Sequence, residues 1–296
     1  MEKLFNSLST CSAESKIRSY ITESVSDIFD TVITDNIGNL IAHKDGKGEK
    51  ICIECGMGSH GIMVVAAKDG KAHFSGVGTL KPSYLADKKI VMESGKVGIV
   101  RANGEISEST KLSDMYIDID TENMSIGDFG VVYPEFTETD SAFYANGLSD
   151  VIALSALIKA LPTLGDTDLT VVFSAQKILN GRGMRGFFAD RTFDKVFTLA
   201  CCEKTEKGCV VVVKDKSAVA STALRDEICG VAKECGIEIQ LAVSDENFML
   251  GHIVHGGEGN PCIAICVPVS HMGKTLEKAE KSDFIQVTKL IEAIIK

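Results

Sequence analysis

The stretch Cys262-Ile263-Ala264-Ile265-Cys266-Val267 is apolar at every position. A strand that faces water on one side alternates apolar and polar residues, whereas a strand buried on both faces does not. Residues 210–213 are also continuously apolar, residues 169–173 are apolar except for Thr170, and a segment with helical spacing, 151–161, precedes them. Such strands alternating with helices predict an α/β domain, in which a mostly parallel sheet is flanked by helices.

The same alternation extends outward in both directions from these runs. Towards the C-terminus it predicts strands at 196–199 and 237–243 and helices at 218–235 and 284–295, with Gly236 as the residue that ends the first helix. Towards the N-terminus it predicts a helix over 12–30 with Ser12 as its N-cap, then short strands at 31–34, 40–42 and 51–53.

Residues 62–145 differ from the rest of the chain. Their apolar runs are short and separated by Gly, Asp and Asn, and no helical spacing occurs among them. This pattern is typical of a small all-β domain. We therefore expect an α/β domain formed by residues 1–61 and 146–296, interrupted by a β-rich insert formed by residues 62–145.

The composition argues against several classes of protein. The 296 residues include 31 basic and 41 acidic ones, a formal net charge of −10, whereas a general nucleic-acid binder needs a basic surface. No apolar run reaches the roughly 18 residues of a membrane span, and the first residues lack the pattern of a signal peptide. We therefore expect a cytoplasmic protein with neither nucleic acid nor membrane as partner. The ten cysteines are expected to be small buried apolar side chains in a reducing compartment.

Several short strings occur in an order that resembles one family, the tetrahedral (TET-type) metallo-aminopeptidases, which include glutamyl aminopeptidases. They are DNIGNLI at 35–41, HGIMV at 60–64, FSAQ at 173–176, RG at 182–183 and GIEIQ at 236–240. The resemblance covers nearly the whole chain. It implies a zinc-peptidase-like α/β domain, and it places the insert where that family carries its dimerisation domain.

The resemblance also implies where a catalytic site would lie. The family holds two divalent ions, such as Zn or Co, bridged by an Asp, and a Glu serves as general base. In this chain most of those positions carry other residues. The metal-binding His falls on Gly56, the acid after it on Gly58, the bridging Asp on Ser149 next to Asp150, the general base on Lys177, its metal-binding neighbour on Ile178, and a further Asp near Ala200 or Cys201, with Glu203 close by; the last ligand is retained as His271.

These substitutions share a physical pattern, because the acids disappear together with the cations that they would hold. Carboxylates left without metal ions would be unpaired buried charges, which cost several kcal/mol each or become protonated. We therefore expect no bound metal or other cofactor and no ordinary metallopeptidase activity. The resemblance then implies a metal-free binding or assembly homologue, with a peptide or small-molecule ligand and homo-oligomers formed through the insert.

An active peptide or acyl-amino-acid hydrolase is the alternative. In the family, the equivalents of Ser149 and Lys177 lie on opposite sides of one water molecule, and a desolvated Lys can activate a Ser nucleophile. The competing interpretation is that Lys177 only fills space and pairs with Asp150. A relocated metal site could instead use Glu54 or Glu203, one of Cys55, Cys201 and Cys202, and His271.

Two further motifs are weak. Cys52 and Cys55 have the spacing of half a zinc site, but residues three apart on a strand point to opposite faces. The string GRGMRG at 181–186 matches the dinucleotide-binding pattern G-x-G-x-x-G but does not directly follow a predicted strand. We expect it to be a flexible loop whose Arg182 and Arg185 face solvent or the cleft.

Overall fold

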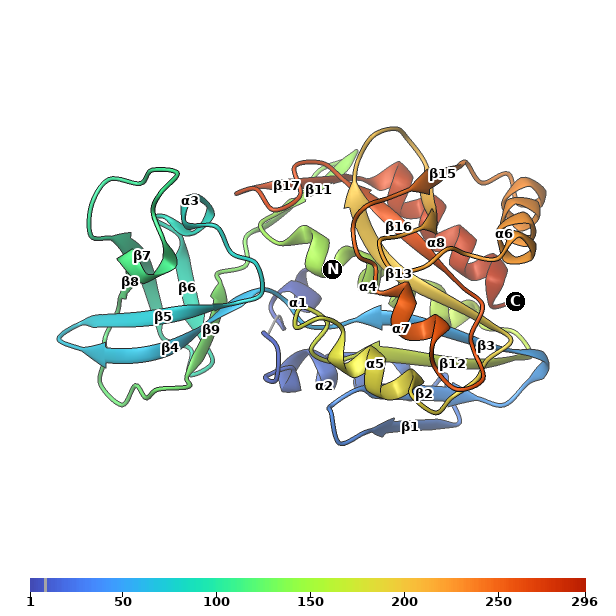
Figure 1. Ribbon diagram of the computed structural model, residues 1–296, viewed down its shortest axis with the longest axis horizontal. Coiled ribbons are helices and arrows are strands. Elements are labelled where there is room, and N and C mark those ends of the chain that lie inside the picture. The colour runs from blue at the N-terminus through green and yellow to red at the C-terminus, as the bar shows by residue number, and fades with distance from the viewer. Residues whose placement is uncertain (8–9) are drawn as a thin grey trace.

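The structure of this chain is a computed structural model that describes residues 1–7 and 10–296. Its two parts, an α/β domain and a β-barrel, lie side by side along the longest axis (Figure 1). Within the described residues, no helix is long and apolar enough to cross a membrane.

A mixed eight-stranded sheet forms the centre of the α/β domain. Its strand order is β1 (Thr31–Thr34), β2 (Leu40–Lys44), β12 (Thr167–Ser174), β3 (Lys47–Gly56), β13 (Lys195–Glu203), β16 (Cys262–Val269), β14 (Cys209–Lys214) and β15 (Ile239–Val243). The four central strands β12, β3, β13 and β16 are mutually parallel, and antiparallel pairs occur towards both edges. The predicted α/β class is confirmed, and the central strands end together at one edge, where ligands bind in many such sheets.

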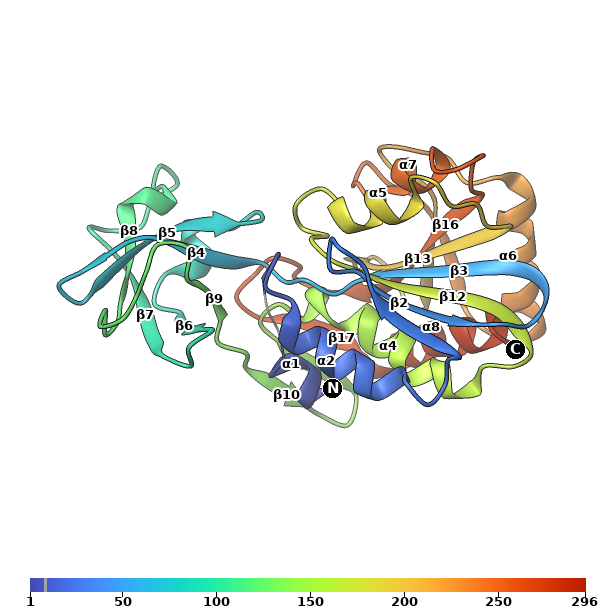
Figure 2. The same cartoon turned by 90° about the horizontal axis from the view of Figure 1, so that it is seen from below.

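Helices cover both faces of this sheet, which explains the continuous apolar strands. All eight residues of β16 are buried. One face packs against α2 (Ser15–Val25), α4 (Ile152–Ala160), α6 (Thr222–Glu234) and α8 (Lys281–Ile294), and the other against α5 (Arg182–Phe188) and α7 (Leu250–Val254). Figure 2 shows α5 and α7 on one side of the sheet and α2, α4 and α8 on the other.

The ends of the predicted helices need small corrections. Helix α2 begins after Glu14, and Ser12 is not its N-cap but lies in the left-handed region, with φ 68°. Gly236 does follow α6 with a left-handed φ of 63°, and its amide donates to the carbonyl of Lys233. The turn after α6 is therefore the one that the sequence predicts.

The prediction of a flexible loop at 181–186 is wrong, because α5 begins at Arg182. A Cβ on Gly183 would lie 2.2 Å from Asn39 Oδ1 and 2.3 Å from the Ala175 carbonyl oxygen, so the helix backbone lies directly against its neighbours. The buried side chains of Met184, Phe187 and Phe188 then pack on the sheet. Close packing accounts for this glycine.

The insert forms a closed barrel with its own apolar core. Its strands follow each other around the barrel in the order β4 (Gly61–Lys68), β5 (Lys71–Val77), β8 (Met115–Asp118), β7 (Val97–Ala102), β6 (Lys89–Met92) and β9 (Phe129–Val132). One short helix, α3 (Pro82–Leu85), lies between β5 and β6, where no helix was predicted. Four residues are too few to show helical periodicity.

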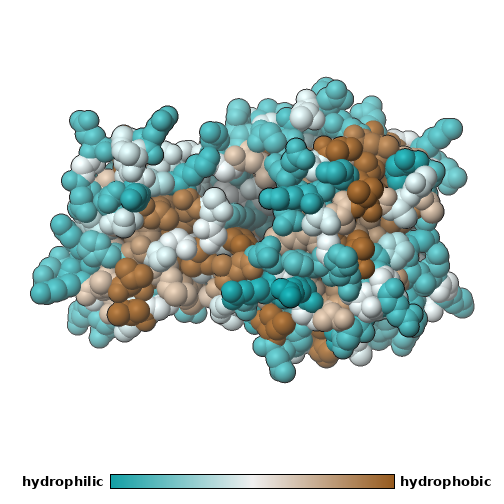
Figure 3. Space-filling view, viewed as in Figure 1, coloured by the Kyte–Doolittle hydropathy of each residue, from teal (hydrophilic) through white to brown (hydrophobic). Residues whose placement is uncertain are grey.

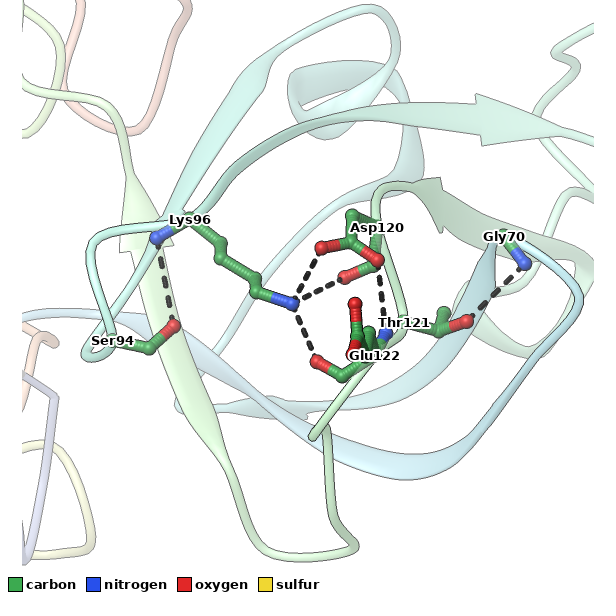
Figure 4. A network of polar contacts seen from close by, with 6 residues as sticks. All are labelled: Gly70, Ser94, Lys96, Asp120, Thr121 and Glu122. Atoms are coloured by element: carbon green, nitrogen blue, oxygen red, sulfur yellow. Dashed lines mark hydrogen bonds and ion pairs between the residues drawn. The ribbon is translucent and has the colours of Figure 1, made fainter.

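A lysine links two connections of the barrel (Figure 4). Lys96 Nζ donates to Asp120 Oδ2 at 2.7 Å and to the Glu122 carbonyl oxygen at 2.5 Å. The hydrogen bond from Lys96 lowers the pKa of Asp120, with the backbone amide of Glu122 as a smaller cause. The β6–β7 turn is thereby fastened to the segment that follows β8.

A third, three-stranded sheet joins the end of the insert to the C-terminal part. It consists of β10 (Phe136–Glu138), β11 (Ala142–Ala145) and β17 (Glu277–Glu280). All its pairs are antiparallel, with Ala145 opposite Glu277. The pairing brings β17 beside the short 3-10 helix η2 (Leu148–Asp150), which carries two of the predicted site residues.

Candidate functional site

Gly56 is the last residue of β3, at the edge where the parallel strands end. A Cβ at this position would lie 2.0 Å from Lys177 Cδ and 2.8 Å from its Cβ and Cγ. The Lys177 side chain therefore lies directly on the backbone of Gly56. It occupies the space into which a side chain at position 56 would extend.

A carboxyl group lies buried below this lysine. Glu54 is inaccessible to solvent, and its Oε1 accepts a hydrogen bond of 2.5 Å from Ser174. Its Oε2 has no hydrogen-bond partner among the described residues. Burial raises the pKa of Glu54, whereas the Lys177 ammonium and the Ser174 hydroxyl oppose that rise.

Lys177 carries a positive charge at this edge. Burial is the largest single effect and lowers its pKa, but the charge of Glu54 together with smaller effects from Cys55, Cys201 and Cys266 outweighs burial, and the pKa is raised. No ion pair within 4.0 Å joins Lys177 to another side chain in the described part of the chain. The cation is held near Glu54 by the fold without direct contact.

The structure does not bring Lys177 together with Ser149 or Asp150. Ser149 Oγ donates to Glu277 Oε1 at 3.0 Å, and the amide of Ser149 donates to Glu277 Oε2 at 2.7 Å. Asp150 instead contacts the His60 ring. The predicted pairing of Lys177 with Asp150 is therefore wrong, because His60 occupies that carboxylate.

Glu277 is a site residue that the sequence did not reveal. It is 2% exposed and accepts three hydrogen bonds, two from Ser149 and one of 2.7 Å from the amide of Gly273. Burial raises its pKa, and these donors oppose the rise. Its strand, β17, is short and polar, so no hydrophobic pattern marks it.

His60 and Asp150 form a second pair that the sequence did not reveal. Asp150 Oδ1 lies 3.2 Å from His60 Nδ1, and the amide of His60 donates to Oδ2 at 3.3 Å. Burial opposes protonation of His60, but the charge of Asp150, its hydrogen bond to the ring and the smaller effect of Glu277 together outweigh burial, so the pKa of His60 is raised. Ile178 lies close by, since a Cβ on Gly78 would meet both Ile178 Cγ2 and His60 Cδ2 within 2.6 Å.

A carboxylate from the N-terminal segment lies over Gly58. A Cβ on Gly58 would lie 3.1 Å from Glu14 Oε1 and 3.7 Å from Cys11 Sγ. Glu14 is 2% exposed and accepts a 2.8 Å hydrogen bond from the amide of Gln176, whose φ is 53°. Burial, followed by the charge of Glu14, raises the pKa of Cys11 to about 11.

His271, the retained ligand of the family pattern, lies away from the buried Glu54 and Ser174. It is exposed, with φ 65°, and its amide donates to Glu203 Oε1 at 2.8 Å, while the amide of Met272 donates to Oε2 at 3.0 Å. Glu203 thus holds the backbone of the turn, whereas Glu54 lies buried with Ser174. No three His, Cys, Asp or Glu side chains lie in position to hold a metal ion across residues 1–7 and 10–296. The side chains present do not fit the pair of divalent ions of the resembling family.

A cavity of about 740 Å³ lies between the barrel and the α/β domain. His60, Leu80, Lys81 and Tyr84 line it from the barrel side, and Ser149, Asp150, Gly273, Lys274 and Glu277 from the other side. A second cavity of about 410 Å³ shares Lys81, Tyr84, Gly273 and Lys274 with the first. Figure 3 shows the surface recessed between the two domains.

Known proteins that resemble this chain in sequence and in fold include several described as peptidases. The family model described as M42 glutamyl aminopeptidase matches residues 38–290. A lysyl aminopeptidase of Pyrococcus furiosus is 27% identical over 324 residues, which span 94% of this chain and 90% of that protein. The TET1 peptidase of Pyrococcus horikoshii, described as assembling into a tetrahedron or a large octahedral shell, is 25% identical with a TM-score of 0.86, over 99% of this chain and 97% of that one. An aminopeptidase of the archaeon Desulfurococcus kamchatkensis shares the fold, with a TM-score of 0.90 at 17% identity, over 99% and 92% of the two chains.

Proposed function

The chain belongs to the M42 glutamyl aminopeptidase family, and from this premise we propose that it is a metal-free member that binds a ligand without metallopeptidase chemistry. The ligand is a peptide or small molecule held in the cavity between the two domains. The observation that carries the proposal is the contact between Gly56 and Lys177, since a lysine occupies the space beside the position of a metal-binding histidine.

Charge supports the same conclusion. Two divalent ions would add about four positive charges to this edge of the sheet, and several anionic or imidazole ligands are needed to hold them. Here the edge carries the ammonium of Lys177, and Glu54, the acid that acts on its pKa, is fully buried. A divalent ion beside Lys177 would be repelled by a like charge in a medium of low dielectric constant.

Metal analysis tests the proposal. The purified chain, incubated with Zn²⁺ and then with Co²⁺ and desalted, should retain far less than one ion per chain by mass spectrometry. A panel of aminoacyl anilides should show no turnover, with or without a chelator. About two tightly bound ions per chain, with turnover that the chelator abolishes, would overturn the proposal.

The alternative of a hydrolase that uses Ser149 and Lys177 lacks this support. The Ser149 hydroxyl donates to Glu277, whereas a serine activated by Lys177 would have to donate to that lysine. Turnover of acyl-amino acids that persists in chelator and disappears in Ser149→Ala would favour this alternative.

We also propose that the chain forms homo-oligomers through its barrel. The related TET1 peptidase of Pyrococcus horikoshii is described as forming closed particles. In this chain Met63, Val65 and Val97 are exposed apolar side chains of the barrel strands β4 and β7. Apolar side chains at the surface of a small domain are suited to a protein interface.

A further inference from the structure

The smaller cavity, which we call the cationic cavity, has a lining that contrasts with the chain as a whole. Although the chain has a net charge of −10, no Asp or Glu lines this cavity in the described structure. Its lining consists of Lys81, Ser83, Tyr84, His271, Gly273, Lys274, Thr275 and Leu276. Two ammonium groups, an imidazole and three hydroxyls therefore face one space.

The charges of its two lysines are not neutralised within the protein. Across the described residues neither Lys81 nor Lys274 takes part in an ion pair or a side-chain hydrogen bond. Three carboxylates line the neighbouring larger cavity: Glu277, which accepts hydrogen bonds from Ser149 and Gly273, Asp150, which contacts His60, and the exposed Glu246. None of them lines the cationic cavity, so the charges that line this cavity itself are positive.

The two lysines also come from different parts of the molecule. Lys81 precedes α3 in the barrel, whereas Lys274 lies between β16 and β17, beside the α/β domain. Both line both cavities. Both are exposed. Like charges that line one partly enclosed space repel each other, and an anion bound between them would reduce that repulsion. Tyr84 can donate to such an anion, because burial, with the charges of Asp150 and Glu277, raises its pKa and keeps its hydroxyl protonated.

We propose that the cationic cavity binds the phosphate or carboxylate group of a small organic anion. The uncharged body of that ligand lies in the larger cavity, against its apolar wall of Leu80, Val131, Val132 and Met272. This inference rests on the proposed function and names the chemical class of its ligand. Phosphates and carboxylates accept several charge-assisted hydrogen bonds, which lysine ammonium groups supply.

Isothermal titration calorimetry with three probes of similar size tests this inference. Phenyl phosphate and phenylacetate carry the two candidate anionic groups, and benzylamine carries the opposite charge. All titrations contain a chelator, so that contaminating metal cannot bind the anions. At least one anion should bind at one site per chain, the tighter one identifying the ligand's head group, and benzylamine should not bind.

Variants locate the site. The double variant Lys81→Met/Lys274→Met should weaken binding of the anion by about tenfold or more, the loss expected when charge-assisted hydrogen bonds are removed. Lys88→Met/Lys289→Met is the matched control, with one lysine from each domain and neither lining the two cavities, and it should bind like the wild type. Urea unfolding midpoints of both variants equal to that of the wild type would show that folding is unaffected.

Three results would overturn the inference: no binding of either anion, equal binding by the Lys81/Lys274 variant, or equal binding of benzylamine. Metal content measured on the same protein separates failure of this inference from failure of the proposed function. A metal-free chain that binds neither anion contradicts only the cationic cavity. A chain with about two bound ions per molecule contradicts the proposed function.

Discussion

Gly56 and Lys177 depend on each other. The lysine side chain lies within 2.8 Å of the place where a Cβ on residue 56 would stand, from its own Cβ to its Cδ. The part of a lysine next to its backbone cannot move aside as its flexible end can. Glycine at 56 is therefore a condition for lysine at 177, and the charge of Glu54 is the largest of the effects that raise the pKa of that lysine.

A double-mutant cycle measures this dependence. Gly56→Ala should destabilise the protein by roughly 1–3 kcal/mol, the usual cost of overpacking. In a Lys177→Ala background the same change should cost less, because the overlaps with Cδ and Cγ are removed and only the 2.8 Å contact with the Cβ of residue 177 remains. Urea unfolding of the four proteins gives the coupling energy, which is of order 0.5–3 kcal/mol for residues in contact. An equal cost in both backgrounds would mean that the two side chains do not compete for space.

The His60–Asp150 pair makes stability depend on pH. A histidine whose pKa is raised by folding adds stability that is fully present below its unfolded pKa of about 6.5. That stability is lost as the pH rises through the raised pKa of His60. Asp150→Asn should lower the pKa of His60, followed by NMR titration, and should destabilise the protein more at pH 6 than at pH 9. Glu23→Gln, exposed on α2, is the control. An unchanged His60 titration in Asp150→Asn would exclude Asp150 as the cause.

At the scale of elements, the position of α5 depends on the close approach of its backbone at Gly183 to neighbouring atoms. A Cβ on Gly183 would overlap Asn39 Oδ1 and the Ala175 carbonyl oxygen. Gly183→Ala should therefore cost about 2–4 kcal/mol, since both neighbours are buried and fixed. Gly230→Ala, inside α6 with no atom within 4 Å of the new Cβ, should instead stabilise by roughly 0.5–1 kcal/mol. Thermal unfolding of the two variants measures both effects, and a destabilised Gly230→Ala or an unaffected Gly183→Ala would contradict them.

The contrast between local burial patterns and contacts of distant segments explains what the sequence could predict. The strands and long helices follow from burial, which leaves a local pattern in β16 and α8. The α5 helix and the partners of Ser149 and Asp150 leave none, because they depend on which distant segments meet. Glu277 reaches Ser149 only after β17 pairs with β11. Substituted positions such as Gly56 can be identified by resemblance, but the side chain that fills the space is a tertiary property.

For the whole molecule, the two domains contribute differently to the proposed ligand binding. The α/β domain holds the buried Glu54 and Lys177, while the cavities are closed by barrel residues such as Lys81 and Tyr84. Neither domain alone encloses the proposed ligand site. The orientation of the barrel therefore matters for binding, and an oligomer that fixes the barrels would also fix the site.

Two surfaces are candidates for the interface of such an oligomer. Val65 on β4 of the barrel is 47% exposed, and Val243 on the edge strand β15 of the α/β domain is 71% exposed. If the barrel forms the interface, Val65→Lys places an unpaired charge in it, a change that costs several kcal/mol when buried. Light scattering should then give a mass well above the 31.7 kDa of one chain for the wild type and for Val243→Lys, and a smaller particle for Val65→Lys. Dissociation by Val243→Lys alone would place the interface on the sheet edge, and a wild type at monomer mass over a wide concentration range would exclude the oligomer.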